Sequence, residues 1–222
     1  PPILSGLVGS EMCIRDRWLE GAGHRPPLPD DPPSTRSPGD LQAQADASGR
    51  VPFAVAVLGP SAGHGALSAP LADFTVMTDE GAIFTAGPPL VKASLGEDIT
   101  KEDLGGPAVA LASGLIHNHA SDDADALGQI KKWLSYLPSS AWQRPPTDDD
   151  AEGDRPTPEL ADLVEANLRQ PYDMANVITA IMDAGSFFEV QAGFGQSILT
   201  GFARLGGQPV AVVANQPQHL AG

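Results

Sequence analysis

The chain has little of three things that would each point to a class of protein. It contains a single cysteine, Cys13, so it can form no internal disulfide and no thiolate metal cluster. Its 13 Lys and Arg stand against 28 Asp and Glu, so neither the basic face of a nucleic-acid binder nor an attraction to anionic lipid is expected. No apolar run is long enough to span a bilayer. The composition favours a cytoplasmic protein without a nucleic-acid or membrane partner.

Aromatic residues are also scarce, at 5% of 222 residues, whereas 24 glycines and 22 prolines are present. This composition indicates small-residue packing and long irregular segments. Residues 1–39 are expected to be non-native or disordered, because 1–17 contain SEMCIRDR, which resembles adapter-derived sequence, and 18–39 are rich in proline. Residues 141–158, with five acids and four prolines, are predicted to be a linker between folded parts at 40–140 and 159–222. Pro1 at the start and a strand pattern near the end predict a piece of a longer protein.

Strand and helix patterns alternate from residue 40 onward, which predicts an α/β layered fold. The predicted strands are 51–58, 74–77, 82–85, 115–117, 187–190, 197–205 and 209–213. The predicted helices are 40–47, 63–72, 88–93, 122–137 and 174–184, with a capping box at Thr100–Asp103, a cap at Ser121 and a hairpin turn at Gly206-Gly207.

The stretch VPFAVAVLGPSAGHGALSAPLADF, residues 51–74, holds the most informative motif. An apolar strand breaks into glycines and restarts as a helix, which leaves backbone N–H groups at the helix start. Such donors can cradle a phosphate or hold an oxyanion, although a tight packing turn has the same spacing. The segment Gly59–Gly65 lacks the Lys-Ser/Thr ending of a P-loop and the spacing of a dinucleotide fingerprint. The backbone N–H of His64 is a better functional candidate than its side chain, which fits an exposed turn.

Other polar residues have ordinary explanations beside functional ones. His117 and His119 are two residues apart and could share a metal, but no further ligand stands at metal-site spacing. Asp122, Asp123 and Asp125 lack the calcium-loop pattern and fit helix capping better. Neither group predicts a metal site. What remains is a backbone-donor site without an obvious side-chain catalyst.

Several long motifs in order resemble the carboxyltransferase (beta) subunit of biotin-dependent acyl-CoA carboxylases. They are GPSAGHGALSAPLADFTVM, IFTAGPPLVKASLGEDITKEDLGG, ASGLIHN, the DDADAL helix ending in LSYLP, and PYDMANVITAIMDAGSFFEVQAGFGQSILTGFARLGGQPVAVVANQP. The family includes propionyl-CoA and acetyl-CoA carboxylases and methylmalonyl-CoA decarboxylase or transcarboxylase. The resemblance implies an α/β crotonase-like β-β-α superhelix, with part of an N-terminal domain and the start of a second such domain.

The resemblance also implies an activity and its partners. Family members transfer a carboxyl group between carboxybiotin and a short-chain acyl-CoA through an enolate held by backbone oxyanion holes. The implied cofactors are biotin on a partner and a coenzyme A thioester as substrate, with no metal in this chain. The implied partners are the biotin carboxylase/biotin carrier (alpha) subunit and further copies of the full-length subunit, as a hexamer.

The resemblance also implies which residues of this sequence form the site. The first oxyanion hole falls on the backbone amides of Gly63 and His64, where family members often have Gly-Gly. Residues of the same turn and of the next one are expected to bind substrate: Ala62, Gly65, Gly87, Pro88 and Lys92. From the residues alone, Lys92 could meet a phosphate or be a surface lysine.

Two other functions remain as alternatives. A biotin-independent crotonase-like hydratase or isomerase would need a carboxylate beside the hole, and Asp73 is the nearest one in sequence. An inactive, truncated assembly fragment is the non-enzymatic alternative.

Overall fold

A computed structural model describes residues 15–21, 39–149, 151, 154–164 and 170–219 of the chain. These residues form two compact units, which divide between Ile130 and Lys131, within a single helix. The first unit holds β1 (Arg15–Gly21), α1 (Gly39–Ala47), β2 (Phe53–Ala62), η1 (Gly63–Ser68), β3 (Phe74–Thr78), β4 (Ala82–Phe84), α2 (Pro88–Leu95), α3 (Lys101–Gly105), α4 (Pro107–Ala112), β5 (Asn118–Ala120) and most of α5 (Asp123–Leu134). The second holds α6 (Leu160–Leu163), α7 (Met174–Ile181), β6 (Phe188–Val190), β7 (Ile198–Leu205) and β8 (Gln208–Asn215).

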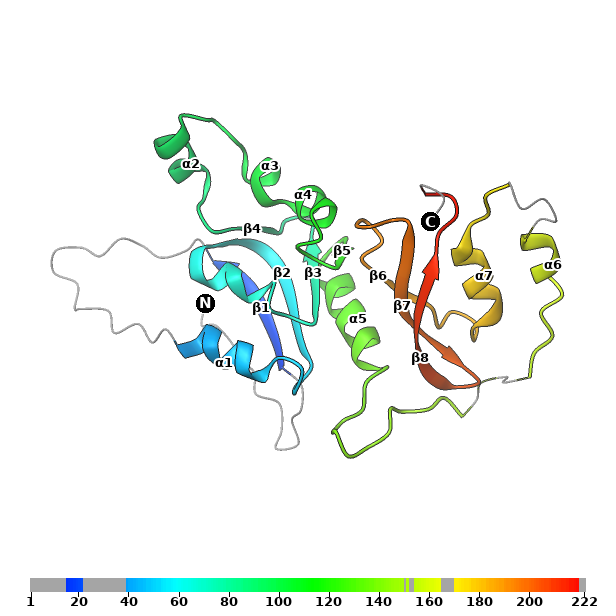
Figure 1. The fold of residues 1–222 in the computed structure, drawn as a ribbon. Helices are drawn as coiled ribbons and strands as arrows, with labels where there is room; N and C mark the ends of the chain where they lie inside the picture. Colours follow the sequence, from blue (N-terminus) through cyan, green and yellow to red (C-terminus); the bar gives the residue numbers. More distant parts are fainter. Residues whose placement is uncertain (1–14, 22–38, 150, 152–153, 165–169, 220–222) are drawn as a thin grey trace. The chain divides into compact units, whose positions relative to one another are not determined.

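The first unit is built on a five-stranded parallel sheet (Figure 1). Its strand order is β1-β2-β3-β5, and β4 also pairs with β2. Ala54 to Val57 of β2 and every residue of β3 are buried, as expected of parallel strands covered on both faces. Trp18 to Gly21, predicted to be irregular, belong to β1, and Leu19 lies in the core of this unit.

Strand β2 is longer than predicted because it serves two neighbours in succession. Residues Ala54 to Val57 pair with β3, and Pro60 to Ala62 pair with β4. The prediction that the strand stops at Gly59-Pro60 is therefore wrong. Proline has no N–H to donate to a ladder, and here it lies where the strand passes from one partner to the next.

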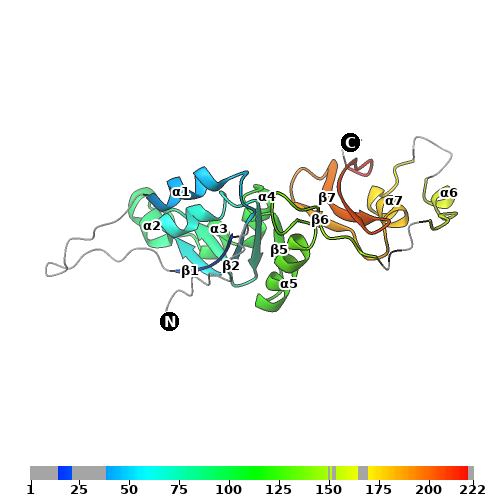
Figure 2. The same cartoon turned by 90° about the horizontal axis from the view of Figure 1, so that it is seen from below.

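The helix predicted over 63–72 is shorter and tighter than expected. It is a 3-10 helix, η1, which ends at Ser68 and contacts α1, β1, β2 and β4. Pro70 follows its C-cap residue and offers no N–H to continue the helix. Figure 2, which views the unit from below, shows α1 lying along one side of the sheet.

Three short helices follow the exit of β4. Pro88 begins α2 after the N-cap Gly87, as predicted, but the helix extends to Leu95. Thr100 caps α3 by accepting the Asp103 N–H at 3.0 Å, which confirms the predicted capping box. Pro107 then begins α4.

The last strand and helix of the first unit differ from prediction in detail. The predicted strand over 115–117 is displaced to β5, Asn118–Ala120, because Leu115 and Ile116 N–H groups donate to the Ala110 carbonyl at the end of α4. Helix α5 is capped by Asp122, whose Oδ1 accepts the Asp125 N–H at 2.8 Å, rather than by Ser121. Helix capping thus accounts for the acids at this position.

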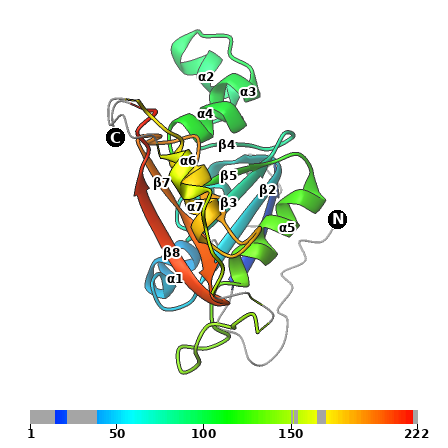
Figure 3. The same ribbon diagram turned by 90° about the vertical axis from the view of Figure 1, so that its right-hand side faces the viewer.

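The second unit has a three-stranded antiparallel sheet, in the order β6-β7-β8. Helix α7 packs on one face, with Ile178 against Leu199, Ala203 and Val212 (Figure 3). Met182 is already extended, so α7 ends earlier than the predicted residue 184. On the other face, the Tyr136 ring stacks with Phe202 at 5.7 Å between centroids. Strands β6 and β7 lie close to their predicted bounds, and β8 extends beyond 209–213 at both ends.

The predicted hairpin turn between β7 and β8 is confirmed. Leu205 pairs with Gln208, and the two glycines between them have φ of 56° and 76°. Both values require the left-handed region that glycine adopts readily. The Asp183 carboxylate, which follows the C-cap residue of α7, accepts the Gly206 N–H at 2.9 Å and the Gly207 N–H at 2.7 Å, and these two bonds stabilise the turn.

The acidic, proline-rich segment predicted as a linker is hydrogen-bonded to this hairpin. The Asp148 N–H donates to the Gly207 carbonyl at 3.0 Å. The Arg204 guanidinium donates to the carbonyls of Pro146 at 2.7 Å, Ser135 at 2.8 Å and Gly207 at 3.0 Å, and lies over the Tyr136 ring. The Arg204 side chain therefore links β7 to the residues after α5, to the acidic segment and to the turn before β8.

Replacing Gly207 with alanine is expected to destabilise the second unit by about 2 kcal/mol. An added Cβ would lie 2.1 Å from the Asp148 carbonyl oxygen, on a residue whose φ is +76°. Gly195→Ala is the matched control, because Gly195 has φ +61° and no heavy atom within 4 Å of an added Cβ. Urea unfolding should show a clearly larger loss for Gly207→Ala; equal losses would mean that the Asp148 contact contributes nothing.

Candidate functional site

The glycine turn lies at the junction of β2 and η1. Ala62 is the extended N-cap residue, with φ −120° and ψ 149°, and Gly63 follows with φ +70°. A side chain is strained at this φ, which explains glycine at this position. An added Cβ at Gly63 would meet no heavy atom within 4 Å, so the space beside its Cα is open. The predicted residues Ala62, Gly63, His64 and Gly65 thus form one continuous turn.

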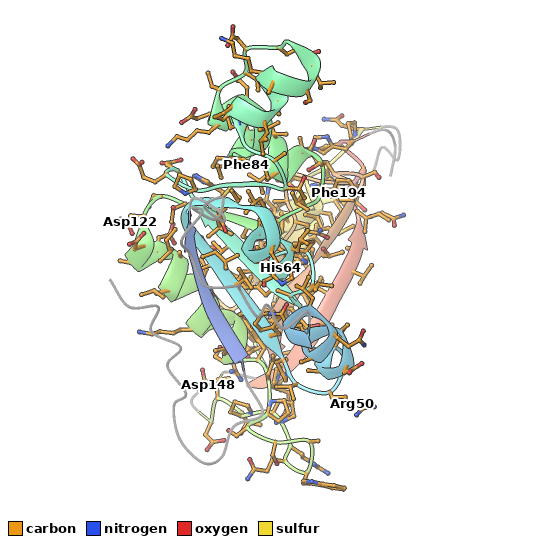
Figure 4. All side chains as sticks on the ribbon, turned by 90° about the vertical axis from the view of Figure 1, so that its left-hand side faces the viewer. Arg50, His64, Phe84, Asp122, Asp148 and Phe194 are labelled. Atoms are coloured by element: carbon orange, nitrogen blue, oxygen red, sulfur yellow. The ribbon has the colours of Figure 1, made fainter. Side chains whose placement is uncertain are left out.

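The exit of β4 lies at the same edge of the sheet as this turn. Ala62 pairs with Phe84 in parallel register, so the two strands end side by side. Figure 4 shows His64 on η1 and Phe84 on β4 within this unit. Gly87 packs on Phe84, where an added Cβ would lie 3.3 Å from the Phe84 Cε2 atom. Gly87 and Pro88 therefore begin α2 at the strand that neighbours the glycine turn.

Lys92 lies one turn further along α2 and forms an ion pair with Asp98. Its Nζ is 2.6 Å from the Asp98 Oδ1 atom, and both side chains are exposed. An exposed ion pair of this kind contributes little to stability, so a phosphate could compete for the lysine. The contacts described for Lys92 do not include the glycine turn.

The two candidate metal histidines face different partners. His117 Nδ1 accepts the Thr75 N–H at 2.9 Å, whereas His119 Nε2 is 2.7 Å from the exposed Asp79 Oδ1. Within the described residues, no three His, Cys, Asp or Glu side chains gather as metal ligands would. The contacts of this pair are those of structural residues.

The carboxylates of α5 are explained by its first turn. Asp125 accepts the Ser121 N–H at 3.0 Å, and this backbone donor lowers the pKa of the Asp125 carboxyl below its usual range. With Asp122 as the N-cap, the acids satisfy orphan donors and favour the positive end of the helix.

Lowering the pH is expected to destabilise the first unit through His117. Burial lowers the pKa of its imidazole, and the nearby Asp73 carboxylate offsets this only in part. Between the lowered pKa of His117 in the folded state and its unfolded value of 6.5, the unfolded chain binds more protons than the folded chain. The neutral imidazole therefore contributes its full stability above pH 6.5, and this contribution is lost as the pH falls towards the folded pKa. His117→Asn, which cannot titrate, should flatten the fall in urea-measured stability between about pH 7 and 5. An unchanged pH profile would contradict the assignment.

Sequence reasoning missed the buried hydrogen bond that holds the C-terminal end of η1. Thr75 is fully buried, and its Oγ1 donates to the Ala69 carbonyl at 2.8 Å. The signal was a threonine between the apolar residues Phe74 and Val76, together with a histidine directly before a strand. Their pairing spans 42 residues, which no local pattern reveals.

Comparison with known proteins agrees with this architecture. The carboxyl transferase domain family model matches residues 37–222. The propionyl-CoA carboxylase beta chain of Saccharopolyspora erythraea is 42% identical over 188 residues, covering 79% of this chain and 34% of the relative. The methylmalonyl-CoA carboxyltransferase 12S subunit of Propionibacterium freudenreichii subsp. shermanii is 38% identical over 181 residues, covering 81% and 34%. The chain therefore spans about a third of the length of these relatives.

Solved structures give the same result at the level of the fold. Transcarboxylase 12S, described as a hexamer with methylmalonyl-CoA and methylmalonic acid bound, matches with a TM-score of 0.77 at 38% identity, covering 82% of this chain and 35% of that chain. A single-chain, multi-domain long-chain acyl-CoA carboxylase matches with a TM-score of 0.80 at 28% identity, covering 93% and 20%. The predicted crotonase-like α/β fold is confirmed. In the part of the chain that the structure describes, no helix has the length and apolar character needed to cross a membrane.

Proposed function

This chain belongs to the carboxyl transferase domain family, and from that premise we propose that it serves carboxyl transfer between carboxybiotin and a short-chain acyl-CoA. The observation that carries the proposal is the left-handed Gly63 turn with open space beside its Cα. A turn of this kind lets a thioester approach backbone donors closely. As a part of the whole subunit, it would supply one oxyanion hole.

The proposed role of the turn is electrostatic. The amides of Gly63 and His64 would hold the thioester oxygen as negative charge develops on it during enolate formation. Donors aimed at such an oxygen each contribute on the order of 3 kcal/mol of transition-state stabilisation. When bound, carboxybiotin supplies the carboxyl group, and biotin supplies the base. We assign no proton transfer to a side chain of this turn.

The proposed ligands and partners follow from the family and the relatives. The thioester would lie against Ala62 and Gly65, with Gly87 and Pro88 at the adjoining strand exit and Lys92 available to a phosphate of CoA. The proposed partners are a biotin carboxylase/biotin carrier (alpha) subunit and further copies of the subunit, arranged as a hexamer. We propose a cytoplasmic location on the strength of the single cysteine. We also propose that 40–140 and 159–222 are parts of two carboxyltransferase domains joined by a linker at 141–158; of the residues before 40, Arg15–Gly21 form β1 and so belong with the first part.

The position of Asp73 disfavours the hydratase alternative. Its Oδ2 accepts the Phe53 N–H at 2.9 Å, at the start of β2, whereas Gly63 follows the end of that strand. Asp73 is thus bonded at the opposite end of β2 from the glycine turn, and it is engaged with that end of the strand rather than with the turn.

Binding of propionyl-CoA to this chain tests the proposal. Propionyl-CoA should shift the backbone amide resonances of Gly63 and His64, whereas CoA without an acyl group should bind without shifting them. Binding that leaves both amides unchanged would refute the oxyanion hole. No binding by calorimetry would support the inactive assembly fragment, and hydration of crotonyl-CoA without biotin would support the hydratase.

A further inference from the structure

The C-terminal end of η1 is fixed by buried side-chain hydrogen bonds. The Ala69 carbonyl, at the C-cap of η1, accepts the Thr75 hydroxyl at 2.8 Å and the Ala72 N–H at 3.1 Å. Ser68 Oγ accepts from the Gln44 amide of α1 at 3.3 Å. Gln44, Ser68, Ala69 and Thr75 are all buried, so a helix of only six residues is anchored at the end opposite Gly63.

Thr75 is in turn held by His117. The Thr75 N–H donates to the His117 Nδ1 atom at 2.9 Å, and the His117 N–H donates to the Thr75 carbonyl at 2.9 Å. The regular pairing of β3 with β5 begins one residue later, at Val76 and Asn118. The imidazole therefore replaces a backbone carbonyl as a ladder acceptor. Its ring also stacks with Phe74 at 5.9 Å between centroids, which limits its orientation.

We propose that His117 is a positioning residue for the glycine turn, acting through Thr75 and Ala69 on η1, the helix that begins at Gly63. The proposal rests on the proposed function only where it concerns substrate. His117 does not touch the reacting atoms in this scheme. It orients Thr75 so that the Thr75 hydroxyl holds η1, and η1 sets the direction of the Gly63 and His64 amides.

The imidazole must accept a hydrogen bond at Nδ1, so a proton on that atom breaks the connection. The charged group that acts on it is Asp73, whose carboxylate accepts the Phe53 N–H beside β3. The backbone N–H of Thr75 is a donor only and cannot adapt to a protonated ring. Protonation of His117 should therefore release Thr75 and change the position of η1.

Three variants and one control separate positioning from general stability. His117→Leu and Thr75→Val each remove one connection, and His117→Asn keeps an acceptor near the place of Nδ1. Ile130→Val is the control, because it mildly truncates a buried residue of the same unit on α5. The readouts are the backbone amide resonances of Gly63 and His64 and the dissociation constant for propionyl-CoA.

We expect His117→Leu and Thr75→Val to shift both amide resonances and to weaken propionyl-CoA binding about tenfold or more. His117→Asn should restore the wild-type resonances, and Ile130→Val should leave them unchanged. In the wild-type chain the two amides should titrate together with the His117 imidazole, a readout that needs no variant. Amides that do not follow the imidazole and do not respond to His117→Leu would overturn the proposal. Shifted amides with unaltered propionyl-CoA binding would support the positioning role and refute the proposed function of the turn.

Discussion

Proline at Gly63 is expected to lower the rate of carboxyl transfer by about 100-fold or more in a chimaera that carries residues 37–222 of this chain within a full-length relative. The substitution removes one proposed oxyanion donor. It also fixes φ near −65°, whereas Gly63 has φ +70°, so the direction of the neighbouring His64 amide changes as well. Steady-state carboxylation of propionyl-CoA measures the effect.

Gly49→Pro is the matched control for this prediction. Gly49 has φ +72° and no heavy atom within 4 Å of an added Cβ, so the backbone conflict is the same, but it lies in the turn between α1 and β2. Both variants should lose similar stability, and only Gly63→Pro should lose activity. Equal activity in the two variants would remove Gly63 from the site.

Alanine at Gly105 is expected to destabilise the first unit by about 3 kcal/mol or more. An added Cβ would lie 2.0 Å from the Ile83 carbonyl oxygen and 2.9 Å from its carbonyl carbon, so helix α3 would have to move away from β4. Both contacting groups belong to backbone, which cannot rotate aside as a side chain does. Urea unfolding monitored by circular dichroism measures the loss.

Gly128→Ala provides a control of opposite sign. Gly128 lies within α5, and an added Cβ there meets no heavy atom within 4 Å. Alanine should therefore stabilise the helix by about 0.5–1 kcal/mol. Because Phe84 of β4 pairs with Ala62, Gly105→Ala should also shift the amide of Gly63, whereas Gly128→Ala should not. A stable Gly105→Ala variant would contradict the close packing of α3 on β4.

Features governed by local chemistry could be predicted from the sequence. Glycines in the sequence marked the Gly63 turn and the Gly206-Gly207 hairpin, where the structure has positive φ, and the Thr100 cap followed from the spacing of a hydroxyl and a carboxylate. Each depends on a few adjacent residues, so a single sequence contains the information.

Features governed by distant partners could not be predicted. Strand β2 continues through Pro60 because β4 takes over from β3, and β5 begins at Asn118 because the preceding residues close the end of α4. The hydrogen bond between His117 and Thr75 has the same origin, since it joins residues 42 positions apart. The glycine turn could thus be located from the sequence, whereas the long-range hydrogen bond between His117 and Thr75 could not.

The contacts of Arg204 bear on where this protein can be divided for expression. Its guanidinium has acceptors in the carbonyls of Ser135 and Pro146, both of which precede residue 159. A recombinant second unit that started at residue 159 would lose these two acceptors and the Tyr136 ring on which the guanidinium lies. One that started at Lys131 would keep all three, so the acidic segment belongs with the second unit when the chain is divided.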